Sequence, residues 1–152
     1  MLEENPLNRG VLSYLCREAG ASATWPIEKP GSRPASSWQS GSHPEIVDHV
    51  WESLASLLPV DCRVVVCGKP VLLAPRRSVI FAVPLGTGYG LRLPPKEFAL
   101  ARAAGAQAIH HYRTSNVMLN LAEQFGPHWI FGTFDAREPE WCMAAYQFAE
   151  AA

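Results

Sequence analysis

The sequence predicts an α+β fold in which an antiparallel meander sheet of four to six strands packs against helices, preceded by an N-terminal helix and an extended linker. Two observations lead to this prediction. Between residues 62 and 94, short apolar runs alternate with turn residues, as in consecutive strands. On either side of them, apolar residues recur at helical spacing. The 152 residues, 48% of them hydrophobic, are enough to bury a core.

The first expected element is a short helix that begins at Asn5 and Pro6, a capping side chain followed by a residue suited to the first helical position. Gly20 is expected to end it. A helix this short is stable only when its apolar face docks on the rest of the protein. The residues of that face are Leu7, Val11, Leu12 and Leu15.

The segment from residue 21 to residue 43 is rich in proline, serine and glycine, which is typical of an extended linker. Trp25 and Trp38 are apolar anchors within it. They pack on the protein's own surface or, alternatively, contact a partner that the segment wraps. We therefore divide the chain into an N-terminal helix with an extended segment, residues 1–43, and a compact α+β domain, residues 44–152.

A second helix is expected between Pro44 and Pro59. Its apolar face consists of Ile46, Val47, Val50, Trp51, Leu54, Leu57 and Leu58.

Four strands are expected next, because the runs rich in valine, leucine and isoleucine are separated by glycine and proline turns. The connections are too short to hold a crossover helix, so neighbouring strands must pair antiparallel. The strands are expected over residues 62–67, 70–74, 78–84 and 90–94.

The last third of the chain predicts further helices and strands. Asp135 and Glu138 have the spacing of a capping box in front of the closing helix. Before it we expect a helix over 96–104 that ends at Gly105, a strand over 106–113, a helix from Ser115 to Phe125 and a strand over 128–134.

A glycine cluster, Gly86-Thr87-Gly88-Tyr89-Gly90, follows one of the apolar runs. A phosphate-binding loop must lead into a helix N-terminus, where backbone N–H groups point at the anion. Here the chain continues into the alternating run Leu91-Arg92-Leu93, so we interpret the cluster as a hairpin turn whose glycines supply positive φ angles. Tyr89, expected at the tip, is a candidate contact residue.

Charge is unevenly distributed along the chain. The net charge is only -1, but the span from Arg63 to Arg113 holds eight basic residues and one acidic residue. This pattern favours a basic sheet face that binds an anionic partner; alternatively, the acidic helices neutralise that face. The candidate binding residues of the basic face are Arg63, Arg76, Arg77 and Arg92.

No motif of catalysis, metal binding or cofactor binding appears in the sequence, and we expect neither a metal nor a cofactor. Four cysteines are too few and too scattered for a disulfide framework. Cys67 and the adjacent His110 and His111 are the candidates for a small enzyme, an activity that we favour less than binding.

The chain shows no apolar stretch long enough to span a bilayer. Its first residues are acidic and include no apolar signal region. We therefore expect a cytoplasmic protein without a membrane partner.

The expected elements follow the order helix, meander, helix, strand, helix. The meander contains three short motifs, Gly68-Lys69-Pro70, Phe81-Ala82 and Leu91-Arg92-Leu93. In this respect residues 44–150 resemble the small bacterial domains of the TfoX N-terminal and YjbR type. The resemblance implies a compact α+β domain without known catalytic residues. For some members it implies a role in regulation or in DNA binding.

Our first hypothesis is a non-enzymatic binding module whose basic sheet face engages an anionic protein or nucleic acid. The first alternative is an inhibitor, immunity or adaptor protein that wraps a protein partner with residues 1–43. The second alternative is a small enzyme that uses Cys67 or the pair His110 and His111.

Overall fold

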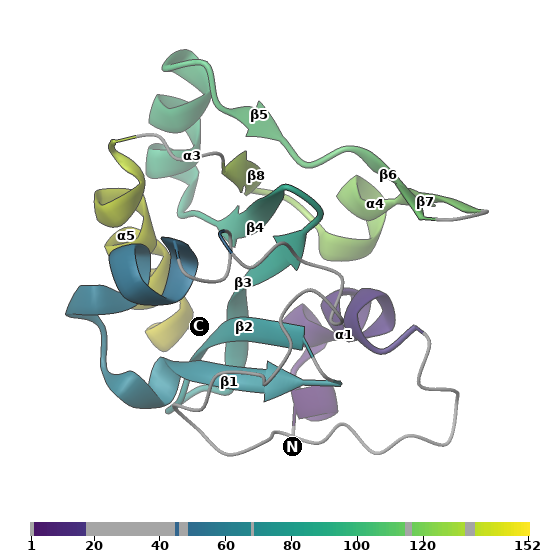
Figure 1. Cartoon of the computed structure of the whole chain (residues 1–152), viewed down its shortest axis with the longest axis horizontal. Helices are drawn as coiled ribbons and strands as arrows, with labels where there is room; N and C mark the ends of the chain where they lie inside the picture. Colours follow the sequence, from purple (N-terminus) through teal and green to yellow (C-terminus); the bar gives the residue numbers. More distant parts are fainter. Residues whose placement is uncertain (1, 18–44, 46–48, 68, 115–116, 133–135) are drawn as a thin grey trace.

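The computed structural model describes residues 2–17, 45, 49–67, 69–114, 117–132 and 136–152 (Figure 1). It confirms the α+β class. A six-stranded antiparallel sheet has the strand order β1-β2-β3-β4-β8-β5, and a separate two-stranded hairpin is formed by β6 and β7.

The first four strands form the predicted meander, since each pairs antiparallel with the next. The remaining strands, β8 and β5, come from later in the chain, and β5 forms the edge of the sheet opposite β1. The strands of the sheet are β1 (Arg63–Val66), β2 (Lys69–Ala74), β3 (Val79–Leu85), β4 (Gly88–Arg92), β5 (Gln107–Ala108) and β8 (Trp129–Gly132).

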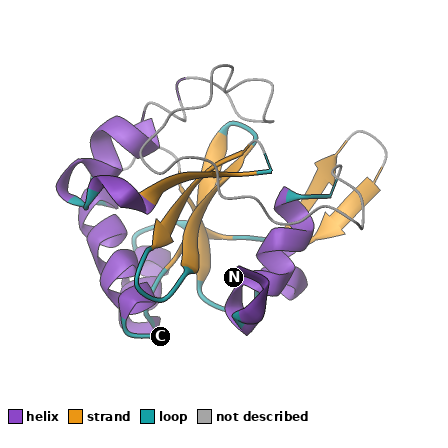
Figure 2. Ribbon diagram, turned by 90° about the horizontal axis from the view of Figure 1, so that it is seen from below, coloured by secondary structure: helices purple, strands orange, loops and turns teal. Residues whose placement is uncertain are grey.

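Successive residues of a strand point to opposite faces of the sheet. Both faces of this sheet are buried. Val65 and Leu72 belong to one core cluster, while Val64 and Val71 belong to the other. Figure 2 shows the strands between two groups of helices.

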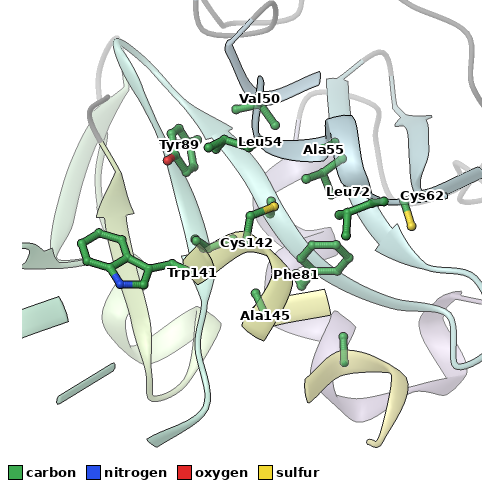
Figure 3. Close-up of a cluster of buried hydrophobic side chains, with 14 of the residues drawn as sticks. Val50, Leu54, Ala55, Cys62, Leu72, Phe81, Tyr89, Trp141, Cys142 and Ala145 are labelled. Carbon is green, nitrogen blue, oxygen red and sulfur yellow. The ribbon is translucent and has the colours of Figure 1, made fainter. Parts of the chain in front are cut away.

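The first cluster is covered by α5 (Glu138–Glu150), by α3 (Pro95–Ala103) and by the helical residues 49–57. Cys142 and Ala145 of α5 lie beside Phe81 of β3 (Figure 3).

The second cluster is covered by α1 (Arg9–Leu15), α4 (Leu121–Phe125) and the hairpin of β6 (His111–Thr114) and β7 (Val117–Asn120). The N-terminal helix docks as predicted, and the Asn5 side chain accepts the predicted capping bond from the Leu7 N–H at 3.0 Å. Leu7 itself is exposed.

Buried Asn8 ties the N-terminal helix to β3. Its Nδ2 donates to the carbonyl oxygens of Leu2 (2.9 Å) and Ser78 (2.6 Å), and its Oδ1 accepts from the Ile80 N–H (3.0 Å). Residues 2–16 therefore share a core with the sheet. The predicted domain boundary at residue 43 lies outside the described residues.

The predicted second helix is present but irregular. A π-helical turn, His49–Ser53, is followed by a 3₁₀ turn, Leu54–Leu57, and residues 46–48 lie outside the described part. Leu57, expected in the core, is 77% exposed, whereas Leu54 and Leu58 are buried as expected.

The predicted helix from Ser115 to Phe125 is wrong over its first half. Residues 117–120 form β7 and pair with β6, and only Leu121–Phe125 is helical. The helix cap is Asn120, whose side chain accepts from the Glu123 N–H at 3.2 Å, while Ser115 lies outside the described residues.

The closing helix starts later than the predicted capping box requires. The residue before its first turn is Arg137, and Asp135 lies outside the described residues. The other predicted helix of this region is confirmed as α3, with Ala104 as its C-terminal cap residue.

The glycine cluster is a hairpin turn, as predicted, since it joins β3 to β4. Of its glycines only Gly86 has a positive φ, at 59°. The expected role is therefore confirmed for Gly86 and wrong for Gly88 and Gly90. Gly90 lies within β4 for a packing reason, because a Cβ there would come within 2.8 Å of the Ile109 side chain.

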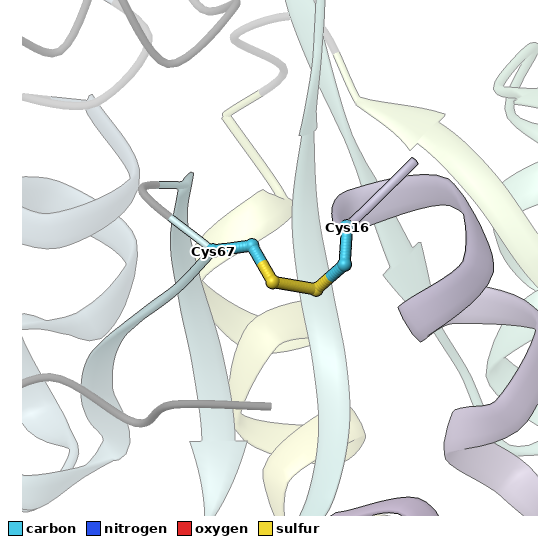
Figure 4. The surroundings of a disulfide bond; sticks show 2 residues. All are labelled: Cys16 and Cys67. Carbon is cyan, nitrogen blue, oxygen red and sulfur yellow. A yellow bond between two sulfur atoms is a disulfide. The ribbon is translucent and has the colours of Figure 1, made fainter. Parts of the chain in front are cut away.

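Cys16 and Cys67 form a disulfide (Figure 4). The expectation that the four cysteines are too scattered for disulfide bonding is therefore wrong for this pair. The bond joins the end of α1 to the turn between β1 and β2, with 5.3 Å between the two Cα atoms. The two cysteines are 51 residues apart in the sequence, so no local motif indicates that they pair.

Among the described residues, we find no helix of the length and apolar character that crossing a bilayer requires.

We predict that reducing the disulfide, or replacing both of its cysteines in C16S/C67S, lowers the free energy of unfolding by about 2–4 kcal/mol. The physical reason is that the bond restricts the unfolded chain across a long loop. Urea unfolding with and without reductant measures the effect. The double variant must be insensitive to reductant, and an equal stability of reduced and oxidised wild-type protein would contradict the prediction.

Candidate functional site

Two predicted basic residues, Arg76 and Arg77, lie in the turn between β2 and β3. The Arg76 side chain is 84% exposed, and its Nε lies 4.0 Å from Oε2 of Glu150. Nε of Arg77 donates to the Glu150 carbonyl oxygen at 3.1 Å. Both guanidinium groups therefore meet the C-terminal end of α5, where the helix dipole favours a cation.

The other two predicted basic residues are partly buried. Cζ of Arg92 lies 4.5 Å from the centre of the Phe148 ring, also on α5. Burial lowers the pKa of Arg92. Arg63 begins β1. Three of the four arginines thus contact the closing helix, Arg76 through a carboxylate, Arg77 through a carbonyl oxygen and Arg92 through an aromatic ring.

Tyr89 is not at a loop tip. It is the second residue of β4 and is 1% exposed, because the turn consists of Gly86 and Thr87 and the strand resumes at Gly88. The other predicted contact residues, Trp25 and Trp38, lie outside the described residues.

Cys67 is no candidate nucleophile in this structure, because its sulfur is bonded to that of Cys16 and no thiolate is present to attack a substrate. His110 and His111 are both exposed. His110 lies between β5 and β6, and His111 is the first residue of β6. The His110 backbone is held there because its carbonyl oxygen accepts from the Leu121 N–H at 3.2 Å.

The structure brings these two histidines together with the glycine turn around one cavity of about 410 Å³. We call it the histidine cavity. The size is within the range of ligand sites, which are mostly apolar with a few polar groups. Its lining residues are Leu85, Gly86, Thr87, Gln107, Ala108, Ile109, His110, His111, Tyr112, Leu121 and Phe131.

The histidine cavity combines apolar side chains with hydrogen-bonding groups. Ile109 and Leu121 are buried apolar residues of the second core cluster. The Tyr112 hydroxyl comes close to the turn, since a Cβ on Gly86 would lie 3.2 Å from it. Hydroxyl and imidazole groups both donate and accept, so the cavity suits a ligand with an apolar body and a polar end.

A buried polar cluster lies on the opposite face of the sheet. Glu138, the first residue of α5, is 1% exposed. Its Oε2 accepts a hydrogen bond from the Tyr89 hydroxyl and lies 3.2 Å from Nε2 of His49. The helix N-terminus further stabilises a carboxylate at this position.

Sequence spacing gave no signal for this cluster. Glu138 is 49 residues from Tyr89 and 89 residues from His49, and the packing of α5 and of the π turn on β4 brings them together. Beside the carboxylate lies a second cavity of about 250 Å³, which we call the glutamate cavity. Its lining residues are Ala104, Gly105, Ala106, Gln107, Phe131, Glu138 and Trp141.

Within the described part of the chain, the histidine, cysteine and acidic side chains form no group of three that could hold a metal ion.

Comparison of the chain with protein-family models, with curated proteins and with solved structures found no match.

We predict that the two free thiols, Cys62 and Cys142, resist alkylation by iodoacetamide at pH 8 while the protein is folded. Burial is the largest cause that raises the pKa of each to about 12, and only the thiolate reacts. In the unfolded chain a cysteine has a pKa of about 8.5, so both must react in urea.

Because the pKa of both thiols is higher in the folded protein than in the unfolded chain, the folded state also loses stability as the pH rises above about 8.5.

Mass spectrometry of the labelled protein counts the modified cysteines. Labelling of either residue in the folded protein, at the rate seen in urea, would contradict the assignment of both as inert core residues.

Proposed function

We propose that the protein is a non-enzymatic binding module and that the histidine cavity is its ligand site. The observation that carries this proposal is the convergence of the Gly86 turn, His110, His111 and Tyr112 on one concave, largely apolar surface. The ligand class that fits is a compact apolar group with a carboxylate or a similar acceptor, because imidazole, hydroxyl and amide donors surround the apolar lining.

The probe that matches this chemistry is 1-anilinonaphthalene-8-sulfonate, an apolar dye with an anionic group. We predict saturable binding to the folded protein. We expect the variant H110A/H111A to weaken it roughly fivefold or more, as for the loss of one or two hydrogen bonds. Both histidines are exposed, so the variant is expected to fold.

Q147A is the matched control, since Gln147 is exposed on α5 and lines neither cavity. Equal dye affinity of the wild type and of H110A/H111A, measured by fluorescence titration, would overturn this choice of site.

A second candidate function is the engagement of an anionic macromolecule by the turn between β2 and β3. The specific observation in its favour is the exposure of Arg76 beside Arg77, since an arginine pair open to water can form bidentate bonds to phosphate or carboxylate. The resemblance to TfoX and YjbR domains, which implies a role in regulation or DNA binding for some members, favours nucleic acid as the partner.

For this second candidate we predict that a short DNA duplex binds the wild-type protein at low salt and that R76E/R77E abolishes binding. Fluorescence anisotropy at increasing salt measures the effect, since each lost phosphate contact reduces the salt dependence. R9E/R17E makes the same change of net charge at two exposed arginines of the N-terminal region. A loss of binding in both variants alike would show a net-charge effect and would contradict a site at the turn.

The hypothesis that residues 1–43 wrap a protein partner through Trp25 and Trp38 stays a prediction. The disulfide bears on the location of the protein, because such bonds are rare in reducing compartments. We therefore propose an oxidising compartment in place of the cytoplasm that the first residues had suggested.

A further inference from the structure

The glutamate cavity differs in chemistry from the histidine cavity. The two share Gln107 and Phe131 at the sheet edge. Glu138 and Trp141 line only the glutamate cavity, whose volume of about 250 Å³ accommodates a group the size of a side chain.

The first feature that favours a cation in this cavity is the Glu138 carboxylate. It is held in place by its contacts with Tyr89 and His49 and by its position at the start of α5. A carboxylate that is fixed away from bulk water attracts a cation more strongly than an exposed one, because screening is weaker there.

The second feature is the end of α3. Ala104 is the C-terminal cap residue of this helix, and Ala104, Gly105 and Ala106 form a wall of the cavity. The carbonyl end of a helix carries the negative end of its dipole and favours a cation.

The third feature is aromatic. Trp141 and Phe131 both line the cavity, and the face of an aromatic ring attracts guanidinium and ammonium groups. The carboxylate, the helix end and the aromatic rings therefore all favour the binding of a cation in this cavity.

Two guanidinium groups of the protein itself already gather at these walls. Nη1 of Arg102 donates to the Ala106 carbonyl oxygen at 2.8 Å, and Cζ of Arg137 lies 5.5 Å from the centre of the Trp141 ring. Arg137 is exposed, so an external guanidinium competes with it for the indole ring.

We propose that the glutamate cavity binds a guanidinium or alkylammonium group, with Glu138 as its counter-ion and Trp141 as its stacking partner. The group belongs either to a small organic cation or to an arginine or lysine side chain of a partner protein. This inference is independent of the function proposed for the histidine cavity, because Glu138 and Trp141 line only the glutamate cavity.

The test compares butylguanidinium with butylurea, its uncharged near-isostere, by isothermal titration of the full-length wild-type protein. We expect the cation to bind at least about tenfold more tightly, as for a hydrogen bond to a charged group. Equal binding of the two compounds, or no binding of either, would overturn the proposal without the use of any variant.

Two variants then locate the site. E138Q is expected to weaken butylguanidinium binding about tenfold or more, whereas E140Q, an exposed neighbour on the same helix, is expected to leave it unchanged. R137Q is expected to strengthen binding about two- to fivefold, because it removes the competing guanidinium from Trp141. Unchanged affinity in a folded E138Q, or weaker binding in R137Q, would contradict the assignment.

A third comparison distinguishes a small organic cation from the side chain of a partner protein. It compares the affinity of butylguanidinium with that of a tripeptide of glycine, arginine and glycine with blocked ends. Tighter binding of the tripeptide indicates a partner protein's side chain, and tighter binding of the free cation indicates a small-molecule ligand. H110A/H111A must leave both affinities unchanged, which separates this site from the histidine cavity.

Discussion

The burial of both faces of the sheet is the constraint on which the rest of the structure depends. Every residue of β3 is buried, whereas an antiparallel sheet commonly leaves one face in water. Helical layers must therefore cover both sides, and the chain supplies them from distant segments. The closing helix covers one face, and the first helix, fastened by Asn8 and by the disulfide, covers the other. The N-terminal residues are thus a structural part of the core.

Much of this architecture could be predicted from the sequence, because the signals are local. Short apolar runs joined by tight turns leave antiparallel pairing as the only option, and the capping bond of Asn5 follows from two adjacent residues. The errors arose where tertiary contacts decide. Residues 117–120 become a strand because they pair with β6, and Leu57 is exposed in the 3₁₀ turn of the irregular second helix.

The candidate sites were less predictable for the same reason. His110, His111 and the glycine turn were singled out from composition, but their convergence on one cavity depends on where the sheet ends. β5 has only two residues, and both cavities lie beside it, since Gln107 lines each of them. Tyr89 was assigned to the turn tip, although the register of β3 and β4 places it inside, against Glu138. No local pattern in the sequence encodes that register.

The disulfide also changes the covalent topology of the protein. Cys16 and Cys67 close a ring of peptide and sulfur bonds that contains every residue between them. Hydrolysis of any single peptide bond within this ring produces two polypeptides that remain linked through sulfur. The first helix would then stay covalently attached to the sheet and would continue to cover the second cluster. A protease acting between residues 17 and 66 could thus convert the chain into a two-chain protein without releasing its N-terminal part.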